Sequence, residues 1–134
     1  MAGTIVQADT SIVDAVKVAT FTCTADSSDG SFPATALTVI PRGGKGGRLL
    51  QIATDPGSTA PQANYDITLT ESGGSDLLLG VAANRHTSNS EVAIIESNGA
   101  NSVYAGTDTL TLNITNNNVN SAGVVVKIYY TEGV

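Results

Sequence analysis

The segment Asn64–Glu71 has the sequence NYDITLTE, in which Tyr65, Ile67 and Leu69 alternate with polar side chains. Successive side chains of a β-strand point to opposite faces, so this alternation places the three apolar residues on one face. A strand with one apolar and one polar face is typical of an antiparallel sheet that packs a single side on a core. The segment therefore predicts a half-buried β-strand.

Period-two alternation or short aliphatic runs recur along the rest of the chain. Six further strands are predicted, at Lys17–Ala25, Ala34–Ile40, Arg48–Thr54, Glu91–Glu96, Asp108–Thr115 and Gly123–Tyr130. The aliphatic run Val92–Ile95 lies between two acids and is typical of a strand covered on both faces. Turn signals rich in Gly, Asn, Asp and Pro separate the strands, and Asp76–Ala83 is compatible with a short helical turn.

Seven or eight short, mostly antiparallel strands without a helical period predict an all-β fold, a single-domain β-sandwich of jelly-roll-like organisation. Residues 16–134 are expected to form the sandwich domain. Residues 1–15 are weakly patterned, and two alternatives stay open for them: a first edge strand, or an arm that pairs with a neighbouring subunit. Thr4, Ile5 and Val6 are the candidate contacts of such an arm. If the segment is an arm, deleting residues 2–14 would weaken the attachment of the protein to its assembly more than it weakens folding.

Composition narrows the classes of partner. The 134 residues fit one domain. Only 13% of them are charged, against about 25% in an average soluble domain, and twelve acidic residues outweigh six basic ones for a net charge of −6. This balance argues against nucleic acid and anionic membrane surfaces as partners, because both attract clustered cations. No secretion signal and no apolar run of membrane-spanning length is recognisable, so synthesis in the cytoplasm is expected.

Few residues suggest chemistry, and we expect no enzymatic activity, no cofactor and no metal site. Cys23 lies in an apolar strand position and is expected to be a buried, inert thiol. The one histidine, His86, is expected in a solvated loop. The segment Asp26–Gly30 lacks the spacing and closing Glu of a calcium loop and favours Asx turns.

The segment Pro41–Arg48 concentrates four glycines with Arg42, Lys45 and Arg48. It does not match a phosphate-binding loop, which needs a Lys followed by Ser or Thr at the start of a helix. Two interpretations stay open: a solvated hairpin tip, or an adaptable basic finger that docks on an acidic partner surface. The three cations are therefore candidate protein contacts.

A longer motif runs through Pro61–Thr70, Gly73–Gly80 and Ala83–Arg85, and the chain has a Val-rich ending at Ala122–Tyr130. These segments resemble a motif of small structural proteins of tailed bacteriophages and prophages. The resemblance covers about two thirds of the chain and departs from the family at Ser72–Ser75, where an acidic Asp-Gly turn is expected.

The resemblance implies a virion structural protein, made in the host bacterial cytoplasm and bound to the capsid exterior as a decoration (cement) protein. Its expected partners are the major capsid protein and its own copies, as a dimer or trimer, and Arg85 in the motif becomes a candidate contact. No small-molecule substrate and no catalytic residues are implied. The alternatives are another virion component (tail, connector or head fibre) or a ligand- or carbohydrate-binding β-sandwich. Carbohydrate binding is disfavoured, because sugar rings stack on exposed aromatic side chains and this chain has no Trp and only four Tyr.

Overall fold

The computed structural model describes residues 2–13, 16–40 and 45–132, and these residues form two antiparallel sheets with no helix among them. The strands are β1 (Thr4–Val13), β2 (Val16–Thr24), β3 (Thr35–Ala36), β4 (Gly47–Pro56), β5 (Asp66–Thr70), β6 (Glu91–Ile94), β7 (Glu96–Ser97), β8 (Ala100–Tyr104), β9 (Thr111–Thr115) and β10 (Gly123–Glu132). The described part of the chain thus has no helical segment with the length and hydropathy to cross a membrane.

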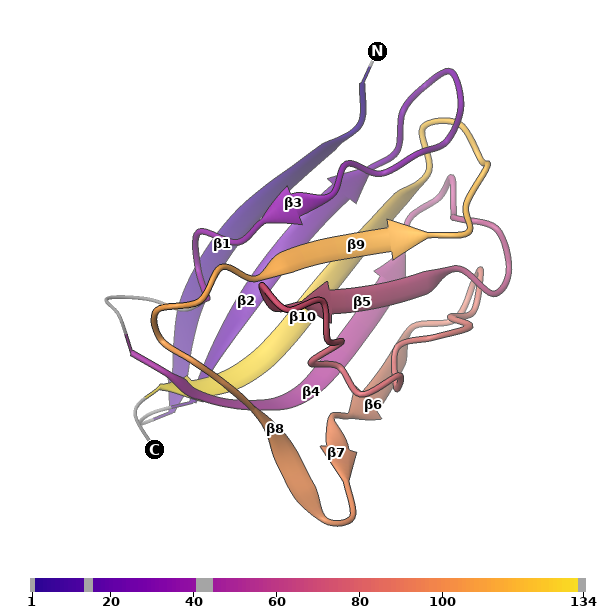
Figure 1. Ribbon diagram of the computed structural model, residues 1–134. Helices are drawn as coiled ribbons and strands as arrows, with labels where there is room; N and C mark the ends of the chain where they lie inside the picture. Colours follow the sequence, from indigo (N-terminus) through magenta and orange to yellow (C-terminus); the bar gives the residue numbers. More distant parts are fainter. Residues whose placement is uncertain (1, 14–15, 41–44, 133–134) are drawn as a thin grey trace.

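The large sheet has the strand order β1-β2-β10-β4-β8-β7, and β6 also pairs with β4. The small sheet has the order β3-β9-β5 and lies across one face of the large sheet (Figure 1). The alternating apolar residues of both sheets meet between the layers. They include Ala19, Phe21, Leu49, Ile52, Ile67, Leu69, Leu112, Ile114, Val126 and Ile128, all buried. Burying each large aliphatic side chain stabilises the folded state by about 2 kcal/mol. The shared core between two antiparallel sheets confirms the predicted all-β sandwich.

The first ten-residue strand belongs to the chain's own large sheet. β1 pairs with β2 from Thr4 opposite Thr24 to Val13 opposite Val16. Of the two alternatives for the N-terminal segment, the structure therefore has the edge strand.

Three side chains of β1 attach it to the interior. Ile5 packs against the core. Gln7 Nε2 donates to Ala36 O at 3.0 Å, and Thr38 N donates to Gln7 Oε1 at 2.8 Å. The buried Tyr130 hydroxyl donates to Asp9 Oδ1 at 2.7 Å. β1 is thus held to both layers of the sandwich.

Some strand boundaries differ from those expected. The segment Ala34–Ile40 contains only the two-residue β3, and Glu91–Glu96 is divided between β6 and β7. The division occurs at Ile95, which is fully buried and donates its N–H to Leu50 O at 2.9 Å. β8 was not predicted, and with these changes the described residues contain ten strands rather than seven or eight.

The segment Asp76–Ala83 forms successive turns rather than a helical turn. The carboxylate of Asp76 organises them: its Oδ1 accepts from Leu69 N at 3.1 Å and Leu78 N at 2.9 Å, and its Oδ2 accepts from Gly80 N at 3.0 Å. These bonds direct the side chain of Leu78 into the core, where it is fully buried. Asp76 of the motif Gly73–Gly80 thus has a structural role in this fold.

Replacing Asp76 with alanine should lower the free energy of unfolding by about 3 kcal/mol, because three N–H groups lose a charged acceptor. The Asp76→Asn variant keeps the Oδ1 acceptor and should lose about 1 kcal/mol. Urea denaturation followed by circular dichroism measures both. Equal midpoints for the wild type and Asp76→Ala would show that the carboxylate does not organise the turns.

Candidate protein-binding surface

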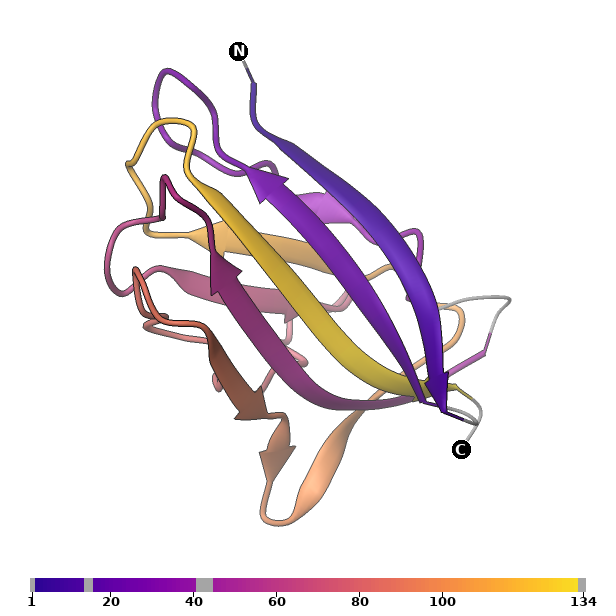
Figure 2. The same cartoon turned by 180° about the vertical axis from the view of Figure 1, so that it is seen from behind.

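The outer face of the large sheet is the side that points away from the small sheet. The strand registers bring outward side chains from five strands together on it. They are Val6, Ala8 and Thr10 of β1; Val18, Thr20 and Thr22 of β2; Val125, Lys127 and Tyr129 of β10; Gln51, Ala53 and Asp55 of β4; and Val92 and Ile94 of β6. We call this set the outer face. Figure 2 shows that no described segment covers it.

The outer face has little charge for a surface of a protein with a net charge of −6. Its two charged members are Lys127 and Asp55, and small or aliphatic side chains and threonines make up most of the rest. Aliphatic exposure is greatest at the margins: Val6 is 63% exposed, Val92 62% and Ile94 53%. Val103 of β8 extends the face beside Arg48 of β4 and is 65% exposed. Exposed aliphatic side chains that gather on one face mark protein-binding surfaces.

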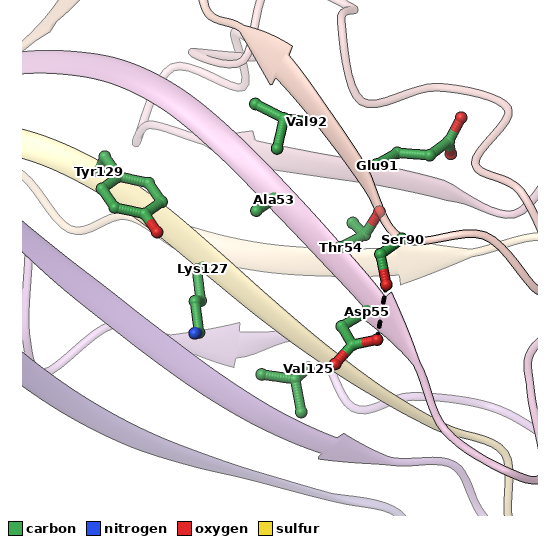
Figure 3. Close-up of a pocket in the computed structure, with 9 residues that line it drawn as sticks. All are labelled: Ala53, Thr54, Asp55, Ser90, Glu91, Val92, Val125, Lys127 and Tyr129. Carbon is green, nitrogen blue, oxygen red and sulfur yellow. Dashed lines mark hydrogen bonds between the residues drawn. The ribbon is translucent and has the colours of Figure 1, made fainter.

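A shallow depression of about 260 Å³ lies within the outer face between β4, β6 and β10 (Figure 3). Lys127 and Tyr129 line one side of it. On the other side Ser90 Oγ donates to Asp55 Oδ1 at 2.7 Å. Pockets for drug-sized ligands measure roughly 300–1,000 Å³ and are concave and mostly closed. The depression suits a side chain inserted from a protein partner better than an enclosed small molecule.

The predicted N-terminal contacts are partly available. Thr4 and Val6 are exposed, whereas Ile5 points inward and is partly buried against the core. Among the predicted cations, Arg42 lies outside the described residues. Lys45 is exposed, and Arg48 is exposed on the outer side of β4 opposite Val103.

The structure does not gather these candidates into one site. Thr4 pairs with Thr24, which pairs with Gly123 at the start of β10. Arg48 pairs with Thr131 at the end of β10. The N-terminal and basic candidates therefore lie at opposite ends of the large sheet.

Arg85 is engaged within the chain. Its side chain is only 13% exposed, its Nη1 lies 3.8 Å from Glu91 Oε1, and its Nη2 donates to Ala83 O at 3.3 Å. Its backbone pairs with that of Tyr65, the residue just before β5. Arg85 thus fastens the loop after Ala83 to the sandwich, and the motif Ala83–Arg85 acts here as a structural unit.

The residues considered for chemistry have structural roles. Cys23 is buried, and this burial raises the pKa of its thiol to about 12, so the nucleophilic thiolate is scarce at neutral pH. His86 is exposed in a loop and its Nδ1 accepts from the backbone N–H groups of Ser88 and Asn89, each at 3.0 Å. Residues 2–13, 16–40 and 45–132 contain no group of three side chains suited to hold a metal ion.

The segment Asp26–Gly30 confirms the predicted Asx turns. Asp26 Oδ1 accepts from Ser28 N at 2.7 Å, and Asp29 Oδ1 accepts from Ser31 N at 2.9 Å. The hydrogen bonds from the Ser28 side chain and backbone hold the pKa of the Asp26 carboxyl below its usual value.

Sequence reasoning missed the exposed aliphatic residues of β6 and β8. The aliphatic run Val92–Ile95 favoured a strand covered on both faces, and this prediction is wrong for the outer side of β6. The flanking Glu91 and Glu96 were the available signal, since a fully covered strand rarely begins and ends in acids. No pattern distinguished Val103, because Ala100–Tyr104 alternates weakly.

Comparison of the chain with protein-family models, with curated proteins and with solved structures found no match. The phage-like character of the motif therefore stays a prediction from the sequence.

Proposed function

We propose that the protein is a structural virion component of a tailed bacteriophage or prophage, which binds the outside of the capsid and stabilises it. It is made in the bacterial cytoplasm and acts without catalysis, with the major capsid protein as its partner. The outer face of the large sheet forms the main contact, and the depression beside Lys127 receives a side chain of the capsid.

The observation that carries this proposal is the exposure of Val92, Ile94 and Val103 on one sheet face that no described segment covers. A lasting protein interface buries more than about 1,000 Å², and a face spanning five strands offers a continuous surface for one. Repetition of the same contact over a capsid lattice adds avidity to a modest individual affinity.

Charge and architecture support a place on the capsid exterior. The net charge of −6 opposes contact with packaged DNA, because like charges repel. The sandwich is joined by turns whose backbone is held by side chains, as at Asp26 and Asp76. A stiff body of this kind keeps the outer face in a single shape, which lowers the entropic cost of binding.

The proposal is tested by measuring how many copies of the protein are present in phage particles produced by a bacterial strain that carries its gene. After density-gradient purification, quantitative mass spectrometry should find the protein in full heads at hundreds of copies per particle. A few tens of copies would assign it to a tail, connector or head fibre instead. Its absence from the particles would overturn the proposal.

A binding assay tests the surface itself. Heads from a phage that lacks the gene are mixed with purified protein, and occupancy is measured by co-sedimentation. The variant Val92→Lys/Ile94→Lys/Val103→Lys should bind at least tenfold more weakly, because it places three charges in an apolar contact. Leu79→Lys introduces one lysine at an exposed aliphatic position on the turns beside β5, away from the outer face, and this control should bind normally. If the triple variant occupies the heads as well as Leu79→Lys does, the outer face is excluded as the contact.

A further inference from the structure

The edge of the large sheet at β1 is open. β1 pairs with β2 along one side, and no other described strand pairs with it. Figure 2 shows it, in indigo, as the outermost strand of the sheet. An open edge presents unpaired N–H and C=O groups that can template another strand, so natural proteins usually protect it with Lys, Pro, bulges or a covering segment.

β1 carries little such protection. Its sequence TIVQADTSIV contains no Lys, Arg or Pro, and Asp9 is its one charged residue. The side chain of Asp9 points inward and accepts the Tyr130 hydroxyl, so it does not guard the outer side. The one register shift lies between Ser11 and Val13, which leaves Thr4–Ser11 regular. A long, regular and nearly uncharged edge is suited to β-augmentation.

We propose that a second copy of the chain pairs with β1 along this edge, antiparallel and about a twofold axis that passes midway between Ala8 and its copy. Residues directly opposite in an antiparallel pair lie on the same face of the sheet. A twofold axis perpendicular to the sheet satisfies this condition when one residue of β1 lies opposite its own copy. The outer faces of the two sheets then join into a single surface.

Side-chain chemistry selects Ala8 as the centre. An axis at Asp9 would place two carboxylates opposite each other, and like charges in that position are destabilising. An axis at Gln7 would place Ile5 opposite the carboxylate of Asp9. With the axis at Ala8, Gln7 lies opposite Asp9, Val6 lies opposite Thr10, and the small Ala8 side chains meet at the centre.

A second copy fits this edge better than an unrelated strand for two reasons. The outward residues around the axis are uncharged, so pairing brings no two charged side chains together on the outer face of two chains of net charge −6. The contact is also isologous: it uses the same edge of both chains and leaves neither open, so it closes as a dimer. The inference goes beyond the proposed function and does not depend on it. On a capsid, the dimer would present two outer faces and bind bivalently.

Light scattering coupled to size-exclusion chromatography of the purified wild-type chain should give twice its mass of 13.6 kDa. The double variant Val6→Lys/Thr10→Lys changes two exposed residues and places two Lys–Lys pairs across the proposed dimer axis. The variant Val6→Lys/Thr10→Glu places two Lys–Glu pairs there instead. The dissociation constant of the Lys/Lys variant should exceed that of the Lys/Glu variant by about thirtyfold.

Val92→Lys/Val103→Lys is the control, because it adds the same charge at equally exposed aliphatic positions far from β1. It should stay dimeric, and circular dichroism should show all variants folded. A wild-type chain that is monomeric at its highest soluble concentration would overturn the self-pairing and leave the edge to a different partner. A dimer that tolerates Val6→Lys/Thr10→Lys as well as the control does would overturn the β1 contact. Neither result bears on the presence of the protein in virions.

Discussion

Replacing Gly47 with alanine should destabilise the protein by more than about 4 kcal/mol and leave a large share of the chain unfolded. Gly47 begins β4, where it pairs with both Tyr104 of β8 and Glu132 of β10. A Cβ atom there would lie 1.8 Å from Thr131 O and 2.7 Å from Thr131 C. Both are backbone atoms of a strand in the middle of the large sheet, so neither can move aside without breaking the β4–β10 ladder.

Gly123→Ala is the matched control for this variant. Gly123 also lies in a central strand, and a Cβ there would meet only Cys23 O at 3.8 Å, an ordinary contact. We expect Gly123→Ala to fold with an unfolding midpoint close to that of the wild type, as measured by urea denaturation and circular dichroism. If Gly47→Ala unfolds at the same urea concentration as Gly123→Ala, the close approach of β4 and β10 at Thr131 is wrong.

Deleting residues 2–13 should remove more than half of the free energy of unfolding, which is typically about 5–15 kcal/mol for a domain of this kind. The deletion removes the whole β1–β2 ladder and the packing of Ile5 on the core. It also removes the acceptor Asp9 from the buried Tyr130 hydroxyl, and a buried donor without its partner costs about 1–3 kcal/mol. An arm would be dispensable for folding, but this strand is not.

Comparing the thermal unfolding of the truncated chain with that of Val6→Lys/Thr10→Lys separates loss of the dimer from loss of the folded sandwich. The double variant should lose the dimer and keep a cooperative unfolding transition, because it leaves Ile5, Gln7 and Asp9 in place. The truncated chain should lose the transition itself or show it at a much lower temperature. A truncated chain with a melting temperature equal to that of the double variant would mean that β1 is an appendage, as the arm alternative supposed.

These expectations reverse the order inferred from sequence, in which truncation weakens attachment more than folding. The reversal depends on Gln7 and Asp9. In sequence they are polar residues in a weakly patterned segment, and nothing marks them as inward. In the folded chain Gln7 bonds residues 36 and 38, and Asp9 bonds residue 130. Polar residues that find distant partners interrupt the apolar alternation on which strand prediction depends.

The sequence predicted only some of the residues of the candidate surface. Thr4 and Val6 were singled out and are exposed, and Arg48 lies beside Val103 on the outer side of β4. Arg85 was singled out for its place in the motif, yet its guanidinium is bound to Ala83 and Glu91. Exposure of a cation depends on whether the fold brings an acceptor to it, and that acceptor need not be visible in a local pattern.

The alternation of apolar and polar residues, as in Asn64–Glu71, was enough to predict an all-β sandwich, because it commits a strand to one buried face whatever its neighbours are. Which faces and edges stay uncovered depends on how the strands pair and pack in the folded chain. β4 pairs with β6, β8 and β10. Among the described residues, the small sheet covers only one side of the large sheet, and no strand lies beyond β1. The period of a strand specifies its two faces, whereas its partners depend on contacts between residues far apart in the chain.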